Sequence, residues 1–585
     1  MKNNSRKKQL WLQLAVITGI IIAINIISSI YYQRIDLTND HRYTLSEPTK
    51  KLVKGVNDIV FVKVYLEGKD MQRDMRRLRD ATHEMLDEFR AIAGDKIQYE
   101  FIDPAAKKDA KERDEFYKIL NGKGLQPVEV GEQDNESASE RIYWPGAIIS
   151  YGNREIAVQL MQQEVSSAST DDKNADQVNK SIIGLEYALA NGIRKIFITD
   201  LNKPKIAFIQ GHGELPEYRI KSIEDALKQY YRVDFVNLPE YKAAAYDTVQ
   251  KKYVYRLDGY EAIIIAKPDS TFNEVEKYKI DQYIMRGGKV LWLIDPLFAD
   301  LDSLKGGQEI THNYPLNIID DLLFTYGVRL NYNLVQDLNC QYIPTISSAY
   351  GSQNKAELHK WPYYPVVTPS SDHPIVNNLN AIWFRFASTI DTLNGKHNIN
   401  VQKTILLQTS PQTRIVLNPA RISLDLIGNI DPKLYFHGPQ NLAVLLEGSF
   451  ESAYKNRIPP GEQKGAYGVY KDVSPYTSMI VVSDGDVIKN EVNFSKGIVY
   501  PLGFDPYTNA TFGNQDFMLN CIDYLADKTG LITVRAKNIK IRLLDVAKVK
   551  DEKLYWQIMN MVVPILALAF FGIIYNYVRR RRFTD

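Results

Sequence analysis

Between Lys203 and Pro296, short apolar runs alternate with stretches that carry one apolar and one polar face. The apolar runs are Lys205–Gln210, Val233–Val236, Tyr260–Ala266 and Lys289–Asp295, and the amphipathic stretches are Ile220–Tyr231 and Asn273–Met285. Apolar runs that alternate with helical spacing predict βαβ units and a parallel sheet. Because these runs are apolar throughout, we expect both faces of the strands to be buried. The pattern predicts a central doubly wound α/β domain over residues 203–340.

A second, smaller α/β domain is predicted for residues 31–165. Ile59–Leu66 has the composition of a strand, and Met71–Ala93 has apolar residues at helical spacing. Ile97–Ile102 alternates between apolar and polar residues, which predicts a half-buried strand. Gly131–Glu140 is polar and is predicted to be a loop. The domain has thioredoxin-like size but no Cys-x-x-Cys motif, which excludes thiol–disulfide redox chemistry of that type.

The remaining segments are harder to divide. Residues 166–202 are predicted to be a linker and a helix. Residues 341–430 are rich in Pro, Ser and Asn with short β-like pieces, so we expect a β-rich insertion with long loops. Strand patterns return in residues 431–545, which form either a second α/β part or the completion of the central sheet. The sequence leaves these two alternatives open.

Both ends of the chain are predicted to span a membrane. Leu10–Ile30 contains 21 residues without a charge, and Trp556–Val578 contains 23. About 20 apolar residues cross a hydrocarbon core as a helix, so both segments are long enough. The alternatives are a cleaved signal peptide for the first and a buried core helix for the second. Basic residues cluster in the outer tails, 1–9 and 579–585, which places both termini in the cytoplasm and residues 31–555 on the far side.

Composition narrows the class of protein. The chain has 585 residues, which is too long for one core, and 72 basic against 70 acidic residues, which gives no electrostatic case for binding nucleic acid. Cys340 and Cys521 are the only cysteines, so a thiolate metal cluster is excluded, while a single pairing between them stays open. The eight His residues show no His-x-x-x-His spacing, and no Gly-x-x-x-x-Gly-Lys-Ser/Thr loop is present. We therefore expect no zinc site, no cofactor and no ATP hydrolysis by a P-loop.

Two polar turns follow predicted strands, at the edge where open α/β sheets bind ligands. The first is Gly211-His212-Gly213-Glu214, whose glycines allow a ligand to approach the backbone, and whose alternative is a simple tight turn. The second contains Asp484 and Asp486, which can bind a hard cation through their carboxylates or can form an ordinary turn. Between residues 203 and 339 the sequence has no Cys, and the central domain has no Gly-x-Ser-x-Gly, so we expect no catalytic nucleophile and no catalytic residue. These six residues are the candidates for ligand binding.

Two motifs, in this order between the two apolar segments, carry a resemblance to a known family. They are Arg42-Tyr43-Thr44-Leu45-Ser46, just after the first apolar segment, and the Gly211–Glu214 turn. With them, essentially the whole chain resembles the GldG family, the gliding-motility-associated ABC transporter auxiliary proteins of Bacteroidetes. The resemblance implies a subunit of the cell inner membrane that has no catalytic activity of its own. From the sequence itself we expect a periplasmic body and a central sheet of flavodoxin- or amidotransferase-like type.

The resemblance further implies an ABC permease and a separate ATPase as partners, and a link to gliding motility and secretion. In this hypothesis the periplasmic domains bind a partner protein or a substrate. The rival hypotheses are a membrane-anchored hydrolase that uses His212 and Glu214, and a passive scaffold that binds only proteins.

Overall fold

The computed structural model describes most of the chain. The described residues are 11–12, 14–25, 44–69, 71–106, 109–134, 137–161, 171–200, 202–240, 244–247, 252–306, 308–347, 355–395, 398–455, 457, 470–536 and 552–583. The chain divides into two compact units, Met1–Asn538 and Ile539–Asp585. The first unit is mixed α/β with several sheets, and the second contains a long apolar helix.

The N-terminal domain is built on a four-stranded sheet with the order β2-β1-β5-β6. Its strands are β1 (Val60–Val64), β2 (Ile97–Phe101), β5 (Gly146–Tyr151) and β6 (Arg154–Gln159). Strands β1 and β2 are parallel because α3 (Arg73–Ala93) connects them, whereas β5 and β6 form an antiparallel hairpin. Helices α2 (Glu47–Lys54) and α4 (Ala110–Gly122) complete this domain.

The polar stretch predicted as a loop is a hairpin instead. Strands β3 (Val128–Asp134) and β4 (Ser137–Tyr143) pair antiparallel over seven residues each. The composition of this stretch gave no strand signal, because backbone pairing between neighbouring segments does not require an apolar face. The prediction of a loop over Gly131–Glu140 was therefore wrong.

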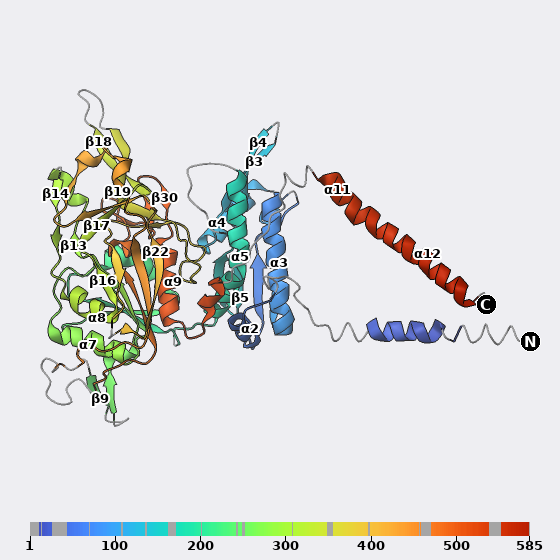
Figure 1. Cartoon of the computed structure of the whole chain (residues 1–585), viewed down its shortest axis with the longest axis horizontal. Coiled ribbons are helices and arrows are strands. Elements are labelled where there is room, and N and C mark those ends of the chain that lie inside the picture. Colours follow the sequence, from blue (N-terminus) through green and yellow to red (C-terminus); the bar gives the residue numbers. More distant parts are fainter. Residues whose placement is uncertain are drawn as a thin grey trace, which may run out of the picture. The chain divides into compact units, whose positions relative to one another are not determined.

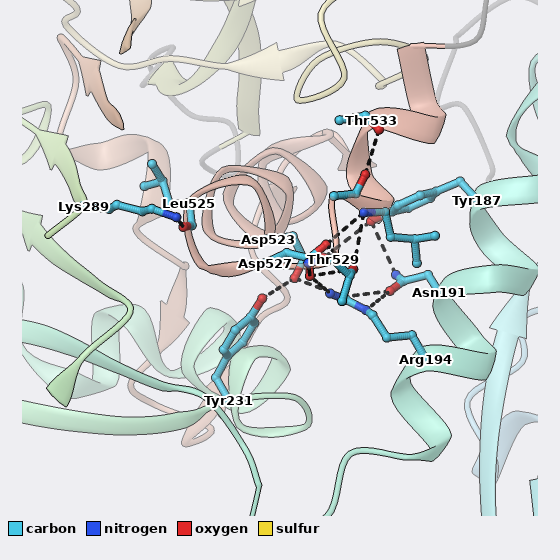
Figure 2. Close-up of polar contacts among 12 residues, drawn as sticks. Tyr187, Asn191, Arg194, Tyr231, Lys289, Asp523, Leu525, Asp527, Thr529 and Thr533 are labelled. Carbon is cyan, nitrogen blue, oxygen red and sulfur yellow. Dashed lines mark hydrogen bonds and ion pairs between the residues drawn. The ribbon is translucent and has the colours of Figure 1, made fainter. Parts of the chain in front are cut away.

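Helix α5 (Asp171–Ile196) follows the N-terminal domain and packs beside α3 and the outer strand β6 (Figure 1). Arg194, in its last turn, joins the helix to the end of α9 (Asn514–Ala526). The guanidinium lies 3.5 Å from Oδ1 of Asp523 and 3.2 Å from Oδ1 of Asp527 (Figure 2). The hydroxyl of Tyr231 also donates to Asp523, at 2.5 Å. These ion pairs are largely buried, so they tie α5 firmly to the larger domain.

The larger domain is organised around a seven-stranded sheet with the order β22-β25-β26-β12-β11-β7-β8. The strands are β7 (Lys205–Gln210), β8 (Arg232–Asn237), β11 (Ala262–Ala266), β12 (Val290–Leu293), β22 (Val401–Gln408), β25 (Asn441–Gly448) and β26 (Thr477–Val482). The five strands from β26 to β8 are parallel, and β25 and β22 add an antiparallel edge. Strands β25 and β26, from the range 431–545, thus belong to the central sheet, whereas β27 (Val492–Asn493), β28 (Ile498–Val499), β29 (Phe504–Asp505) and β30 (Ala510–Thr511) pair separately. Strand β22, which lies within the range of the predicted insertion, also belongs to the central sheet.

Both faces of this sheet are buried, as the uninterrupted apolar runs require. One face, with Phe208 and Leu291, packs against α6 (Glu217–Lys228) and α9. The other face, with Trp292, packs against α7 (Glu274–Met285) and the turns η4 (Ile319–Leu323) and α8 (Phe324–Tyr326). Alternate residues of each strand therefore serve opposite cores.

Short strands between β12 and β25 form a separate layer with its own core around Trp361, Tyr364 and Phe386. They are β13 (Leu297–Phe298), β14 (Gln308–Ile310), β15 (His312–Asn313), β16 (Val328–Leu330), β17 (Asn333–Asp337), β18 (Cys340–Ser347), β19 (Lys355–Val367), β20 (Ile382–Trp383), β21 (Ile390–Thr392), β23 (Thr413–Leu417) and β24 (Arg421–Ser423). We call this layer the cap, because loops from it reach the ends of the central strands.

The C-terminal unit contains one continuous helix, built from α11 (Lys553–Gln557), η10 (Ile558–Val562) and α12 (Val563–Phe583). Within the described ranges, Lys553–Arg581 is the one helix long and apolar enough to cross a membrane. The apolar helix near the N-terminus, Leu14–Asn25, is shorter, and the rest of the predicted first span lies partly outside the described residues. The structure therefore supports one span, and the prediction of two goes beyond it.

Candidate functional site

The Gly211–Glu214 turn lies at the carboxyl end of β7, where the sequence placed it. Gly211 and Gly213 have φ angles of +119° and +76°, a region that favours glycine. A Cβ atom on Gly213 would lie 1.8 Å from Oδ1 of Asp269. The carbonyl of His212 accepts hydrogen bonds from the N–H groups of Asp269 and Ser270, at 2.9 and 3.2 Å. Gly213 is thus required by the close approach of the loop after β11, and Gly211 by Pro239 after β8, whose Cδ would lie 2.5 Å from a Cβ atom there.

The ring of His212 is enclosed within the protein, with 3% of the residue exposed. Its Nε2 lies 3.0 Å from Oε2 of Glu276 and its Nδ1 lies 3.4 Å from Oε1 of Glu214. Phe272 stacks on the ring with 3.6 Å between centroids. Burial by itself lowers the pKa of His212, but the bonds to Glu214 and Glu276 outweigh it, so the pKa is raised. The imidazolium is therefore held between two carboxylates.

Glu276 has a second role, because it closes the N-terminus of α7. Its Oε2 accepts the N–H of Asn273 at 2.7 Å, and the side chain of Asn273 accepts the N–H of Glu276 at 2.9 Å. This reciprocal pair is a capping box. His212 therefore links the turn after β7 to the start of α7, and its contacts are those of a structural residue.

Asp484 and Asp486 lie after β26 and meet two residues from the neighbouring strand ends, Asp295 after β12 and Lys267 after β11. The Nζ of Lys267 lies 3.0 Å from Oδ2 of Asp295 and 2.6 Å from Oδ2 of Asp486. Ligand oxygens of the three aspartates lie within 4.8 Å of one another, a spacing that suits a cation. In this structure the ammonium of Lys267 supplies the positive charge that balances these carboxylates.

The electrostatics of this cluster follow from its burial. Burial lowers the pKa of Lys267, but Asp295 and Asp486 outweigh that effect and raise it well above its usual value. Burial raises the pKa of Asp486, yet the charges of Lys267, Lys489 and Arg385 reverse the effect and lower it. Burial and the charges of Asp295 and Asp486 raise the pKa of Asp484 well above its usual value, and Lys267 offsets this only in part. Burial also raises the pKa of Asp295 against the opposing charge of Lys267.

The cap covers this cluster. The backbone N–H of Arg385 donates to Oδ2 of Asp484 at 2.6 Å, and its guanidinium lies 2.5 Å from Oε1 of Glu491. Ser388, also in the cap, makes two hydrogen bonds with Ser483. Its N–H donates to the Ser483 carbonyl at 3.1 Å, and its carbonyl accepts from the Ser483 hydroxyl at 2.5 Å. Asp484 is fully buried as a result. The edge at which open α/β sheets commonly bind ligands is filled here by protein.

The structure places the six predicted residues at one edge of the sheet but in two clusters. Strands β11 and β12 lie between β7 and β26, so the clusters are three strand spacings, or about 14 Å, apart. Charged groups of the protein face His212, Glu214 and Asp486, although Nδ1 of His212, Oε1 of Glu214 and Oδ1 of Asp486 have no hydrogen-bond partner among the described residues. Ligand binding by the six residues stays a prediction. Lys267 and Asp295 were missed, although Lys267 directly follows β11 and Asp295 comes two residues after β12, as Asp484 does after β26.

The two cysteines do not pair. Cys340 is partly buried at the start of β18, Cys521 is buried in α9, and both are free thiols. Burial raises the pKa of both, to about 11 for Cys340, so neither is an activated nucleophile at neutral pH.

Comparison with known proteins gives matches of three kinds: family models, a relative and a solved structure. A family model described as an ABC-type uncharacterized transport system matches residues 203–521, and a domain of unknown function (DUF7088) matches residues 39–150. An uncharacterized protein of Borreliella burgdorferi is 21% identical over 566 residues, which cover 95% of each chain. Among solved structures, the mmIFT52 N-terminal domain aligns with 55% of this chain and 97% of its own length, at 13% identity. Its TM-score of 0.29 is too low to support an argument.

Proposed function

The chain belongs to the family described as an ABC-type uncharacterized transport system, and from that premise we propose that it is a non-catalytic, membrane-anchored auxiliary subunit of an ABC transporter. The family match covers more than half of the chain and supports a role in ABC transport. The C-terminal helix, Lys553–Arg581, fits the membrane anchor of such a component.

The proposal that the protein is not an enzyme rests on one observation: other groups of the protein occupy the carboxyl ends of the central strands. Lys267 compensates Asp295 and Asp486, and the cap buries Asp484 beneath Arg385. A hydrolase would need a reactive group that substrate can reach, and His212 is 3% exposed with a carboxylate facing each ring nitrogen. We therefore favour the auxiliary role over the enzymatic alternative.

The sequence supports a more detailed proposal for the membrane topology and the partners. We propose two spans, 10–30 and 556–578, with both termini in the cytoplasm and residues 31–555 in the periplasm. Its partners are a permease and a separate ATPase of the inner membrane, and its periplasmic domains bind a partner protein or a substrate. The resemblance to the GldG family supports a link to gliding motility and secretion.

Purification of the tagged full-length chain in mild detergent, followed by mass spectrometry, tests this proposal. We expect a permease and an ATPase in near-stoichiometric amounts. In a matched variant, residues 553–581 are replaced by an unrelated apolar helix of equal length, which preserves anchoring but changes the helix surface. Loss of the permease from that variant alone would assign the contact to this helix. Recovery of the wild-type chain without either partner would contradict the auxiliary role.

A further inference from the structure

A cavity lies where α5 passes between the outer strand of the N-terminal domain and the larger domain. Its volume is about 290 Å³, and it is lined by residues of β6, of α5, of α9, and by Tyr230 and Arg535. Small-molecule sites commonly form at such domain junctions and have volumes from roughly 300 Å³ upward. The cavity is therefore at the lower end of that range, suited to a molecule the size of an amino acid or a monosaccharide.

The cavity exists because α5 presents small side chains at this point. Ser181, Gly184 and Ala188 line it at helical spacing. A Cβ atom on Gly184 would meet nothing within 4 Å. Gly192, two turns later on the same helix, is tightly packed, since a Cβ atom there would lie 2.5 Å from Val158 and 2.6 Å from Ile149. The space at Gly184 is thus local, and the helix is otherwise closely fitted to the sheet.

Two cations in the wall have no carboxylate partner within the described part of the chain. The Nζ of Lys195 lies 3.5 Å from the centroid of the Tyr230 ring. The guanidinium of Arg535 bonds only neutral oxygens, Oδ1 of Asn520 at 3.3 Å and the carbonyl of Asn377 at 3.0 Å. Burial lowers the pKa of Lys195 to about 8, and the more distant charges of Asp523 and Asp516 offset this effect only in part.

The acidic residues of the wall do not cancel this charge. The charged and titratable groups that line the cavity with Lys195 are Lys180 and Tyr187 on α5, Tyr230 after α6, Asp516 and Asp523 on α9, and Arg535. Asp523 is already engaged by Arg194 and by the hydroxyl of Tyr231 (Figure 2). The wall thus carries three cations, Lys180, Lys195 and Arg535, against two acids, and this net positive charge favours an anion.

We propose that this cavity binds a small carboxylate-bearing molecule, with Lys195 and Arg535 providing the charge. The side-chain amides of Asn191, Asn378 and Asn520, which also line the cavity, supply donors and acceptors for hydroxyl or amino groups of the same molecule. The ligand bridges α5 and α9, so it strengthens the junction between the two domains. The inference goes beyond the transporter role and does not depend on it.

The test is isothermal titration of the full-length protein in detergent with acetate, L-glutamate and D-glucuronate at pH 7. We expect L-glutamate or D-glucuronate to bind with a Kd below about 1 mM and more tightly than acetate. Lys195→Met keeps an apolar stem over Tyr230 and removes the charge, and it should weaken binding at least tenfold. Gly184→Leu fills the space while it leaves both cations in place, and it should abolish binding. Gly122→Leu, at the open end of α4, is the matched control and should bind as the wild type does.

The pH dependence gives a second readout. Between pH 7 and pH 9 the free protein loses most of the charge on Lys195, so affinity should fall roughly tenfold, and this fall should vanish in Lys195→Met. That readout remains decisive if Gly184→Leu lowers the melting temperature. Failure of all three anions to bind the wild type overturns the proposal. Binding that Gly184→Leu leaves intact overturns it as well, because the anion would then lie on the surface.

Discussion

Replacement of Lys267 by Met tests whether the charge cluster at the sheet edge is held together by one ammonium. The ammonium serves two buried carboxylates, at 3.0 Å for Asp295 and 2.6 Å for Asp486. Removal of one partner from a buried ion pair costs about 3–5 kcal/mol, because the other charge is left uncompensated. We expect the variant to lose stability by this amount and not twice as much, since one freed carboxyl can take up a proton.

That loss corresponds to a decrease of roughly 5–15 °C in the melting temperature, which near-ultraviolet circular dichroism of the full-length protein can follow. The matched control is Lys228→Met, whose side chain is 48% exposed and pairs with Glu224. Glu224 itself is buried, but Lys221 also lies 3.4 Å from it and remains in the variant. Loss of the exposed Lys228 charge should therefore cost about 1 kcal/mol or less, and the control should melt within a few degrees of the wild type.

The sign of the pH dependence follows from the carboxyl groups. Without Lys267 the pKa values of the clustered aspartates rise in the folded state, so the folded variant binds protons more tightly than the unfolded chain. Stability is then retained at low pH and lost as pH rises through the folded pKa values. The deficit relative to wild type should be larger at pH 8 than at pH 5. The reasoning would be refuted if Lys267→Met had the same melting temperature as Lys228→Met at both pH values.

Three further predictions concern other parts of the molecule. Gly213→Ala should lower the melting temperature sharply, because its Cβ would overlap Asp269 and because the left-handed backbone costs about 1–2 kcal/mol for alanine. Gly184→Ala has open space at its Cβ, so it should leave the melting temperature unchanged. The raised pKa of His212 contributes stability that is complete below pH 6.5 and is lost as pH rises through the folded pKa. A His212→Gln variant should lack that dependence in melting curves from pH 5 to 9. Deletion of residues 1–30 should leave the protein in carbonate-washed membranes, and adding Leu568→Arg should release part of it, since a central Arg costs about 2.5–3.5 kcal/mol on insertion.

Local patterns in the sequence were sufficient for the elements that depend on local physics. The parallel strands β7, β11 and β12 were identified because strands buried on both faces are apolar without interruption. Helix α7 was predicted over Asn273–Met285 from helical spacing, and it spans Glu274–Met285, where its own capping box begins it. The C-terminal helix could be predicted from the length and apolarity of its segment alone.

The tertiary structure alone decided which segments pair and what each polar side chain meets. Strand β22 joins the central sheet because β25 offers it an edge, a choice that no residue within β22 encodes locally. Asp484 has the same position in the sequence pattern whether it faces a ligand or other protein groups. Its environment was set by Asp295 and by the backbone N–H of Arg385, which lies 99 positions earlier in the chain. Burial and charge compensation are properties of such distant neighbours, so they could be read only once the chain had folded.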